Sequence, residues 1–118
     1  MSFKFPKEEK LKSRKLIDQL FAEGKSVKKF PVKLVYLEVE ALEKTQAAFA
    51  VPKRSFKLAV SRNRIKRQMR EVYRIHKSLL TNNNSKKFAI LIMYIGKDRP
   101  TYNQLDNSIQ LLLKQLTL

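Results

Sequence analysis

The sequence predicts an α+β protein in which helices cover a small sheet, and three observations support this. Residues 58–80 contain no Gly or Pro and repeat apolar side chains every three or four positions, as a helix does. Residues 87–95 are almost continuously apolar, which indicates a buried central strand. With 118 residues, 43% of them hydrophobic, the chain can bury its own core, so we expect one domain over residues 1–118.

The first twelve residues are basic, and we expect them to be extended and to lead into a first helix. Ser13 is a suitable N-cap, and Gly24 suits the C′ position after the last turn. Between them runs one apolar stripe, formed by Leu16, Ile17, Leu20 and Phe21. The stripe either belongs simply to the core or, at Ile17 and Phe21, lines a groove beside the basic helix described below.

Two or three strands are expected next. In residues 26–39, Leu34 and Tyr36 share one face while Val35 and Leu37 share the other, so both faces should be covered. Residues 40–45 are polar and short enough for a hairpin connection. Residues 46–53 form the following strand, with small side chains on one face, Ala48, Ala50 and Pro52. That face would form a shallow trough for an extended ligand or receive a tightly packed helix.

The remaining elements follow from stop signals and apolar spacing. Residues 81–85 end the long helix, and residues 96–100 end the buried strand. Thr101 and Gln104 have the spacing of a capping box. A last amphipathic helix then presents Leu105, Ile109, Leu112 and Leu116. The order helix, two or three strands, helix, strand, helix predicts a single α+β sandwich.

The helix expected over residues 58–80 has two contrasting faces. Its apolar arc holds Leu58, Ile65, Met69, Val72, His76 and Leu79. Its cationic arc holds Arg62, Lys66, Arg70, Arg74 and Lys77, with Arg67 close by. Residues 53–77 contain ten Lys or Arg and one acid, Glu71. Because like charges four residues apart destabilise a helix, a polyanion is the simplest partner, and the alternative is a merely basic surface helix.

The overall charge supports the same class of partner. The formal net charge is +16 and the sequence pI is about 10.3, which favours nucleic acid first and an anionic membrane surface second. No apolar run approaches the roughly 18 to 20 residues of a spanning helix, and the first residues lack a signal-peptide core. The absence of cysteine fits a reducing compartment, so we expect a cytoplasmic protein without a membrane partner.

Little in the chain supports protein-borne chemistry. His76 is the only histidine, and its place on the apolar arc favours a core position at the helix edge over a catalytic base. Glu38 and Glu40 share a strand face and could hold Mg²⁺, but acids beside a polar turn commonly just face water. With two glycines, Gly24 and Gly96, the chain has no Gly-rich phosphate loop. We therefore expect binding of RNA or DNA, with no catalytic residue or metal site on the protein.

Residues 59–71, Ala-Val-Ser-Arg-Asn-Arg-Ile-Lys-Arg-Gln-Met-Arg-Glu, closely resemble the signature of the bacterial ribonuclease P protein subunit. Residues 51–54, Val-Pro-Lys-Arg, resemble the strand-to-helix lead of that family, and residues 20–27 resemble the end of its first helix. The resemblance extends over essentially the whole chain. It implies an αβββαβα sandwich with a small mixed sheet and a left-handed βαβ crossover, against the usual right-handed rule.

The resemblance also implies a role and partners. The family's protein subunit pairs with a large catalytic RNA, one protein per RNA, and the two together remove the 5′ leader from precursor tRNA. The RNA is expected to hold the Mg²⁺ ions of the active site. From the charge we add the hypothesis that a small basic protein offsets repulsion between two RNAs and so lowers the Mg²⁺ concentration that cleavage needs.

Carried over by position, the resemblance assigns two sets of residues. Those facing the catalytic RNA would be Arg62, Asn63, Arg64 and Arg67, together with Lys53 and Arg54. Those of the leader cleft would be Ile17, Phe21, Val35, Ala50, Pro52, Lys66 and Arg70. The family often has aromatic residues where this chain has Ile17 and Val35. Base stacking would then be weaker, and leader affinity would depend more on Phe21, Tyr36 and the cations.

Two other functions remain open at this point. One is a general RNA-binding or ribosome-associated protein of the same charge, which would not depend on a tRNA leader. The other is a stand-alone nuclease, which would cleave RNA without an RNA partner and would need Glu38 or Glu40.

Overall fold

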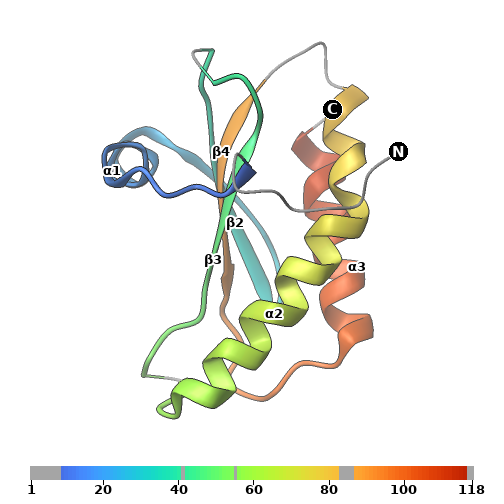
Figure 1. Ribbon diagram of the computed structural model, residues 1–118. Coiled ribbons are helices and arrows are strands. Elements are labelled where there is room, and N and C mark those ends of the chain that lie inside the picture. Colours follow the sequence, from blue (N-terminus) through green and yellow to red (C-terminus); the bar gives the residue numbers. More distant parts are fainter. Residues whose placement is uncertain (1–8, 41, 55, 83–86, 117–118) are drawn as a thin grey trace.

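The computed structural model describes residues 9–40, 42–54, 56–82 and 87–116. In Figure 1 a twisted sheet separates α1 on one side from α2 and α3 on the other. The elements, in chain order, are α1 (Arg14–Glu23), β1 (Lys25–Lys29), β2 (Val32–Glu38), β3 (Gln46–Ala50), α2 (Ala59–His76), the 3₁₀ helix η2 (Lys77–Asn82), β4 (Phe88–Tyr94) and α3 (Tyr102–Leu116). This is the αβββαβα order, and the segment expected as one strand over residues 26–39 is two strands, β1 and β2.

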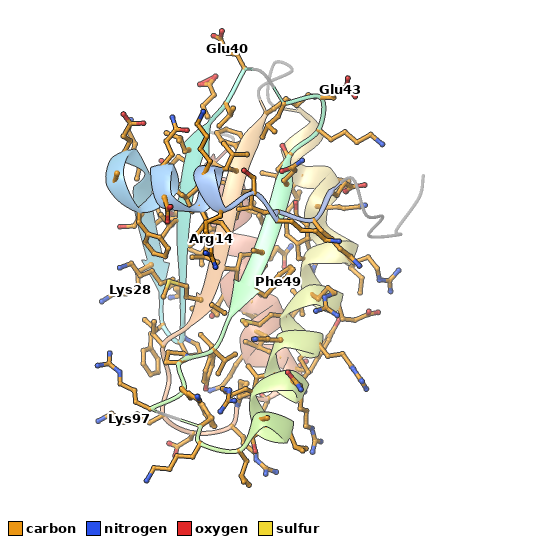
Figure 2. All side chains as sticks on the ribbon, turned by 60° about the vertical axis from the view of Figure 1, so that its left-hand side comes forward. Arg14, Lys28, Glu40, Glu43, Phe49 and Lys97 are labelled. Atoms are coloured by element: carbon orange, nitrogen blue, oxygen red, sulfur yellow. The ribbon has the colours of Figure 1, made fainter. Side chains whose placement is uncertain are left out.

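The four strands have the order β1-β2-β4-β3. The central strand β4 pairs antiparallel with β2 and parallel with β3. Since α2 joins the parallel neighbours β3 and β4, it forms a βαβ crossover, and tracing it from β3 behind the sheet to β4 in Figure 2 gives the left-handed sense. The hairpin expected across residues 40–45 is wrong, because β4, apolar on both faces, takes the place between β2 and β3.

The first helix begins and ends near the predicted residues. The Ser13 hydroxyl accepts a hydrogen bond from the Leu16 amide at 3.3 Å, which confirms the N-cap. Gly24 follows the last turn as expected, but as the C-cap residue and not at C′, and its φ of −68° is not left-handed. Glycine is needed there for close approach instead, since a Cβ would lie 2.3 Å from the Leu20 carbonyl oxygen.

The other two helices also follow the sequence pattern closely. Thr101 and Gln104 exchange hydrogen bonds between side chain and backbone, each at 3.1 Å, which confirms the capping box. The predicted core positions of α3 are all buried: Leu105, Ile109, Leu112 and Leu116. The long basic helix is α-helical to His76 and continues as η2 to Asn82, while residues 83–85 of its expected stop lie outside the described residues.

Two apolar clusters hold the sheet from opposite sides. The larger lies under α2 and α3 and includes Leu34, Ile65, Met69, Ile90, Ile92 and Ile109. The smaller lies under α1 and is formed by Leu11, Leu20, Val35, Ala89 and Leu91. Adjacent β2 residues thus enter different clusters, which confirms the expectation that both faces of this strand are covered. We call the side of the sheet on which α1 packs the α1 face.

Candidate nucleic-acid interface

The long helix α2 is attached to the sheet by a short apolar stripe. Its buried residues are Ile65, Met69, Val72 and Tyr73. Leu58, expected on this stripe, is 69% exposed, because the first turn of α2 lies beyond the ends of the strands (Figure 1). His76 lies at the helix edge as expected, and its Nε2 is 2.6 Å from the Asp106 carboxylate on α3. Burial raises the pKa of the Tyr73 phenol, so this hydroxyl stays neutral.

Three cations of the predicted basic ridge have partners within the protein. Arg62 donates to the carbonyl oxygens of Phe56 and Lys57 at 2.7 and 2.9 Å, and so ties α2 to the segment that precedes it. Arg74 donates to Glu71, and this hydrogen bond lowers the pKa of the Glu71 carboxyl. Lys77 forms an ion pair with Glu9. These contacts show that part of the ridge supports the fold itself.

A second group of α2 side chains points outward. Asn63, Arg64, Arg67 and Arg70 are exposed, and Lys66 is half-buried. Within the described part of the chain, these five side chains form no hydrogen bond or ion pair. Lys53 and Arg54 are also exposed, in the turn that leads from β3 toward α2. Several unpaired cations close together on one helix form a strong binding site for a polyanion.

Two surface hollows lie on either side of α2, and each is lined by a different cation of this helix. The hollow on the α3 side is lined by Ser61, Arg64, Ile65, Gln68, Arg99 and Pro100. The hollow on the β3 side, which we call the edge hollow, is lined by Lys10, Leu11, Lys12, Ala47, Ala48, Phe49 and Arg70. The structure therefore places Arg64 and Arg70 on different sides of the helix, and their assignment to different RNA segments stays a prediction.

The α1 face of the sheet is only partly covered. In Figure 2, α1 crosses the upper half of this face, and no helix of the described residues crosses the lower half. The strand register places Met93 of β4 between Lys33 of β2 and Ala50 of β3 in this lower half, and all three are half-buried. Pro52, shortly after β3, is also half-buried. The uncovered part of the face is thus shallow, with small and apolar side chains beside a cation.

The residues assigned to the leader cleft differ in exposure. On α1, Phe21 is 61% exposed while Ile17 is half-buried against the smaller cluster. Val35 is only 7% exposed, so it supports this face from beneath and presents little surface. The expected contribution of Tyr36 is wrong, because this residue packs on the opposite face, with its ring centroid 6.0 Å from that of Phe88.

Four further cations lie beside these sites and were missed by the sequence analysis: Lys10, Lys12, Arg14 and Arg99. Arg14 points from the start of α1 toward the lower half of the sheet (Figure 2). Lys10 and Lys12 line the edge hollow, and Arg99 lines the hollow on the α3 side. Each lies in a loop or first turn, where no periodic pattern relates a side chain to distant elements. For Lys10, Lys12 and Arg14 the density of Lys and Arg in residues 10–15 was the available signal, and Arg99 had none.

The acidic residues do not gather into a metal site. Among the described residues, no group of three or more His, Asp or Glu side chains could hold a metal ion. Glu38 and Glu40 are exposed, and Glu40 lies with Glu43 at the top of the molecule in Figure 2, far from the first turns of α2. The described side chains therefore do not fit a Mg²⁺ site. In the same described ranges, no helix combines the length and apolar character needed to cross a lipid bilayer.

The fold and the site define a small nucleic-acid-binding α+β protein with a basic helix beside a partly open sheet. The model of the family described as Ribonuclease P matches residues 5–117. The chain belongs to this family, whose members are protein components of the tRNA-processing ribonucleoprotein.

Known relatives agree with this assignment. The ribonuclease P protein component of Chlorobium phaeobacteroides is 35% identical, with 95% of this chain and 87% of the relative covered. That of Porphyromonas gingivalis is 30% identical, with 92% and 83% covered. Among solved structures, the RNase P protein of Staphylococcus aureus has a TM-score of 0.77 at 23% identity, covering 92% of this chain and 94% of that one. The protein from Thermotoga maritima has a TM-score of 0.75 at 23% identity, covering 91% and 96%.

The different surroundings of Arg62 and Arg64 predict different effects on stability. Replacing Arg62 by Ala removes two hydrogen bonds to backbone carbonyls, so the free energy of unfolding should fall by about 1–2 kcal/mol. Replacing Arg64 by Ala removes an unpaired exposed cation, so stability should stay within about 0.5 kcal/mol of the parent. Urea unfolding of both variants measures the difference, and equal midpoints would show that the Arg62 contacts do not stabilise the protein.

Proposed function

We propose that this protein is the RNA-binding subunit of ribonuclease P, and that it binds both the catalytic RNA and the 5′ leader of precursor tRNA. Together with the RNA it forms an endoribonuclease that produces the mature tRNA 5′ end. The observation that carries the proposal is the set of exposed, unpaired cations on α2, which lies between two hollows with basic walls. Membership of the ribonuclease P family indicates which nucleic acids are meant.

The catalytic RNA would lie along the outer side of α2. Arg64 and Arg67 supply exposed guanidinium groups for phosphate oxygens, and Asn63 supplies an amide for a directional polar contact. Lys53 and Arg54 extend this surface beyond the helix. Arg62 has a mixed role, because one of its terminal nitrogens is used inside the protein while the guanidinium carries further donors.

The leader would lie as a single strand along the α1 face and pass toward the other side of α2. Phe21 is the exposed aromatic ring on α1 and offers a surface on which a base can stack. Ile17, Ala50 and Pro52, all half-buried, would form the shallow floor, with Val35 supporting it from beneath. The cations that neutralise leader phosphates would be Lys66 and Arg70, which lie four residues apart on one side of α2.

Catalysis would reside on the RNA subunit. Among the described residues, no group of three or more acidic or imidazole side chains could hold a metal ion, which supports placing the Mg²⁺ elsewhere. We place the Mg²⁺ with the RNA, in a complex of one protein and one RNA. The contribution of the protein is electrostatic, because it neutralises phosphates where two RNAs approach each other and so lowers the Mg²⁺ concentration needed for cleavage.

The direct test is cleavage of precursor tRNA at low Mg²⁺ by the protein alone, by the cognate ribonuclease P RNA alone, and by both together. Activity is expected only with both, and the activity of the RNA alone should return as Mg²⁺ is raised. Cleavage by protein that is free of contaminating nuclease would instead indicate a stand-alone nuclease, to be checked with Glu38→Gln and Glu40→Gln. RNA binding that is independent of any tRNA leader would indicate a general RNA-binding protein.

Phosphate neutralisation by α2 predicts a change in salt dependence. Replacing Arg64, Lys66 or Arg70 by Ala should flatten the slope of log K against log salt concentration by about 0.7–0.9 per residue, because each lost contact retains one counterion on the RNA. Lys29→Ala removes the same charge from β1, at the other edge of the sheet, and should leave the slope unchanged. An unaltered slope in the α2 variants would show that these side chains do not contact phosphate.

The exposed ring of Phe21 predicts a leader-specific loss of affinity. Phe21→Ala should weaken binding of leader-bearing precursor tRNA by about 1–3 kcal/mol, the usual value for one stacked base, and leave binding of mature tRNA unchanged. The matched control is Phe30→Ala, since Phe30 is 70% exposed but lies in the turn after β1. Equal effects of the two substitutions on both RNAs would argue against stacking on Phe21.

A further inference from the structure

The residues just before α1 are attached to the edge of the sheet. Lys10 forms an isolated parallel bridge with Ala47 of β3, and the Leu11 amide donates to the Ala47 carbonyl oxygen at 2.9 Å. The Leu11 side chain is only 5% exposed and belongs to the smaller apolar cluster. This segment therefore extends the sheet beyond β3 by a short stretch of backbone, and the bridge covers part of an edge strand that would otherwise be open.

A second contact fixes the same segment to the end of α2. The Glu9 carboxylate and the Lys77 ammonium group are 2.8 Å apart, and their side chains are only 16% and 15% exposed. An ion pair so well shielded from water is coupled more strongly than a surface pair, and loss of one partner leaves a charge in a poorly hydrated place. Glu9 and Leu11 thus hold the segment from both ends, one against α2 and the other against the sheet.

This attachment gives the edge hollow its second wall. Arg70 of α2 lines the hollow on one side and Lys10 and Lys12 line it from the segment, while its β3 lining consists of Ala47, Ala48 and Phe49. Figure 2 shows the segment running across β3 from the side of α2 to the start of α1. Every charged residue lining the hollow is a cation, so the hollow favours an anionic, extended ligand that can follow β3.

We propose that residues 10–12 form a cationic wall of the single-stranded RNA path, with Lys12 as a phosphate contact. The Glu9–Lys77 ion pair is the positioning device that holds this wall opposite Arg70. The proposal rests on the proposed function and extends it, since it continues the leader path from the α1 face into the edge hollow. The alternative is that the segment only stabilises the fold, with no part in RNA binding.

The contact role is tested in the holoenzyme with precursor tRNA and mature tRNA. The ratio of the two affinities is the leader-dependent gain. Lys12→Ala should reduce this gain and flatten its salt slope by about 0.7, the value for one phosphate of a single strand. The control is Lys15→Ala, an exposed cation three residues later that lies opposite the apolar stripe of α1. Equal gains for Lys12→Ala and Lys15→Ala would overturn the contact role.

The positioning role is tested by reversing charges. Glu9→Lys and Lys77→Glu each break the ion pair, and each should lower the leader-dependent gain by about threefold to tenfold. Glu9→Lys adds positive charge, so a purely non-specific attraction would raise RNA affinity in this variant instead. The double variant E9K/K77E restores an ion pair and the original net charge, and it should recover most of the gain.

The outcomes separate the two proposals. If the unaltered holoenzyme shows no leader-dependent gain, the proposed leader binding itself is wrong. If it shows the gain but Glu9→Lys keeps or increases it, while circular dichroism shows the variant folded, the positioning role is wrong and leader binding stands. Loss of the gain in both single variants together with recovery in the double variant supports the positioning role, because a merely weakened fold would not be restored by exchanging the two charges.

Discussion

The arrangement of the whole molecule depends on the burial of β4. Six of its seven side chains are buried, and it carries apolar residues on both faces, so it needs a strand on each side and cover above and below. Because β4 lies between β2 and β3, β3 is an edge strand of the sheet, and α2 lies beside it. Among the described residues, no other helix or strand covers the outer face of the basic helix.

The first turn of α2 is unfavourable in isolation. It contains no acidic residue, its N-cap residue Leu58 makes no side-chain cap, and Arg62 and Arg64 place positive charge near the positive end of the helix dipole. Val60 is 79% exposed, so burial does not compensate for this. A sequence that departs from local rules at one place usually does so for function. Phosphate groups bound along this end would offset both the dipole and the mutual repulsion of the cations.

The sequence predicted the helices and strands well, but it predicted poorly which of them lie side by side. Periodicity located the three helices, the buried strand and the two faces of β2, because these depend on residues close together in the chain. The hairpin across residues 40–45 was wrong, since pairing is decided by competition with a strand that comes forty residues later. The helical angle alone placed Arg62 on the cationic arc and Leu58 on the apolar arc of α2. It takes no account of where the strands end, and so it predicted neither the backbone contacts of Arg62 nor the exposure of Leu58. The Glu9–Lys77 pair joins residues 68 apart, and no local pattern indicates it.

The balance of forces on a bound leader follows from which side chains reach the surface. Val35 is buried beneath α1, Ile17 is half-buried and aliphatic, and Tyr36 faces the other cluster, so Phe21 is left as the exposed ring on α1. A single ring supports one stacked base. The cations around the same path are more numerous, and they come from the segment before α1 as well as from α2. Under the proposed function, leader binding should therefore be mainly electrostatic and steep in salt, and the position of the charges should matter more than the shape of the apolar floor.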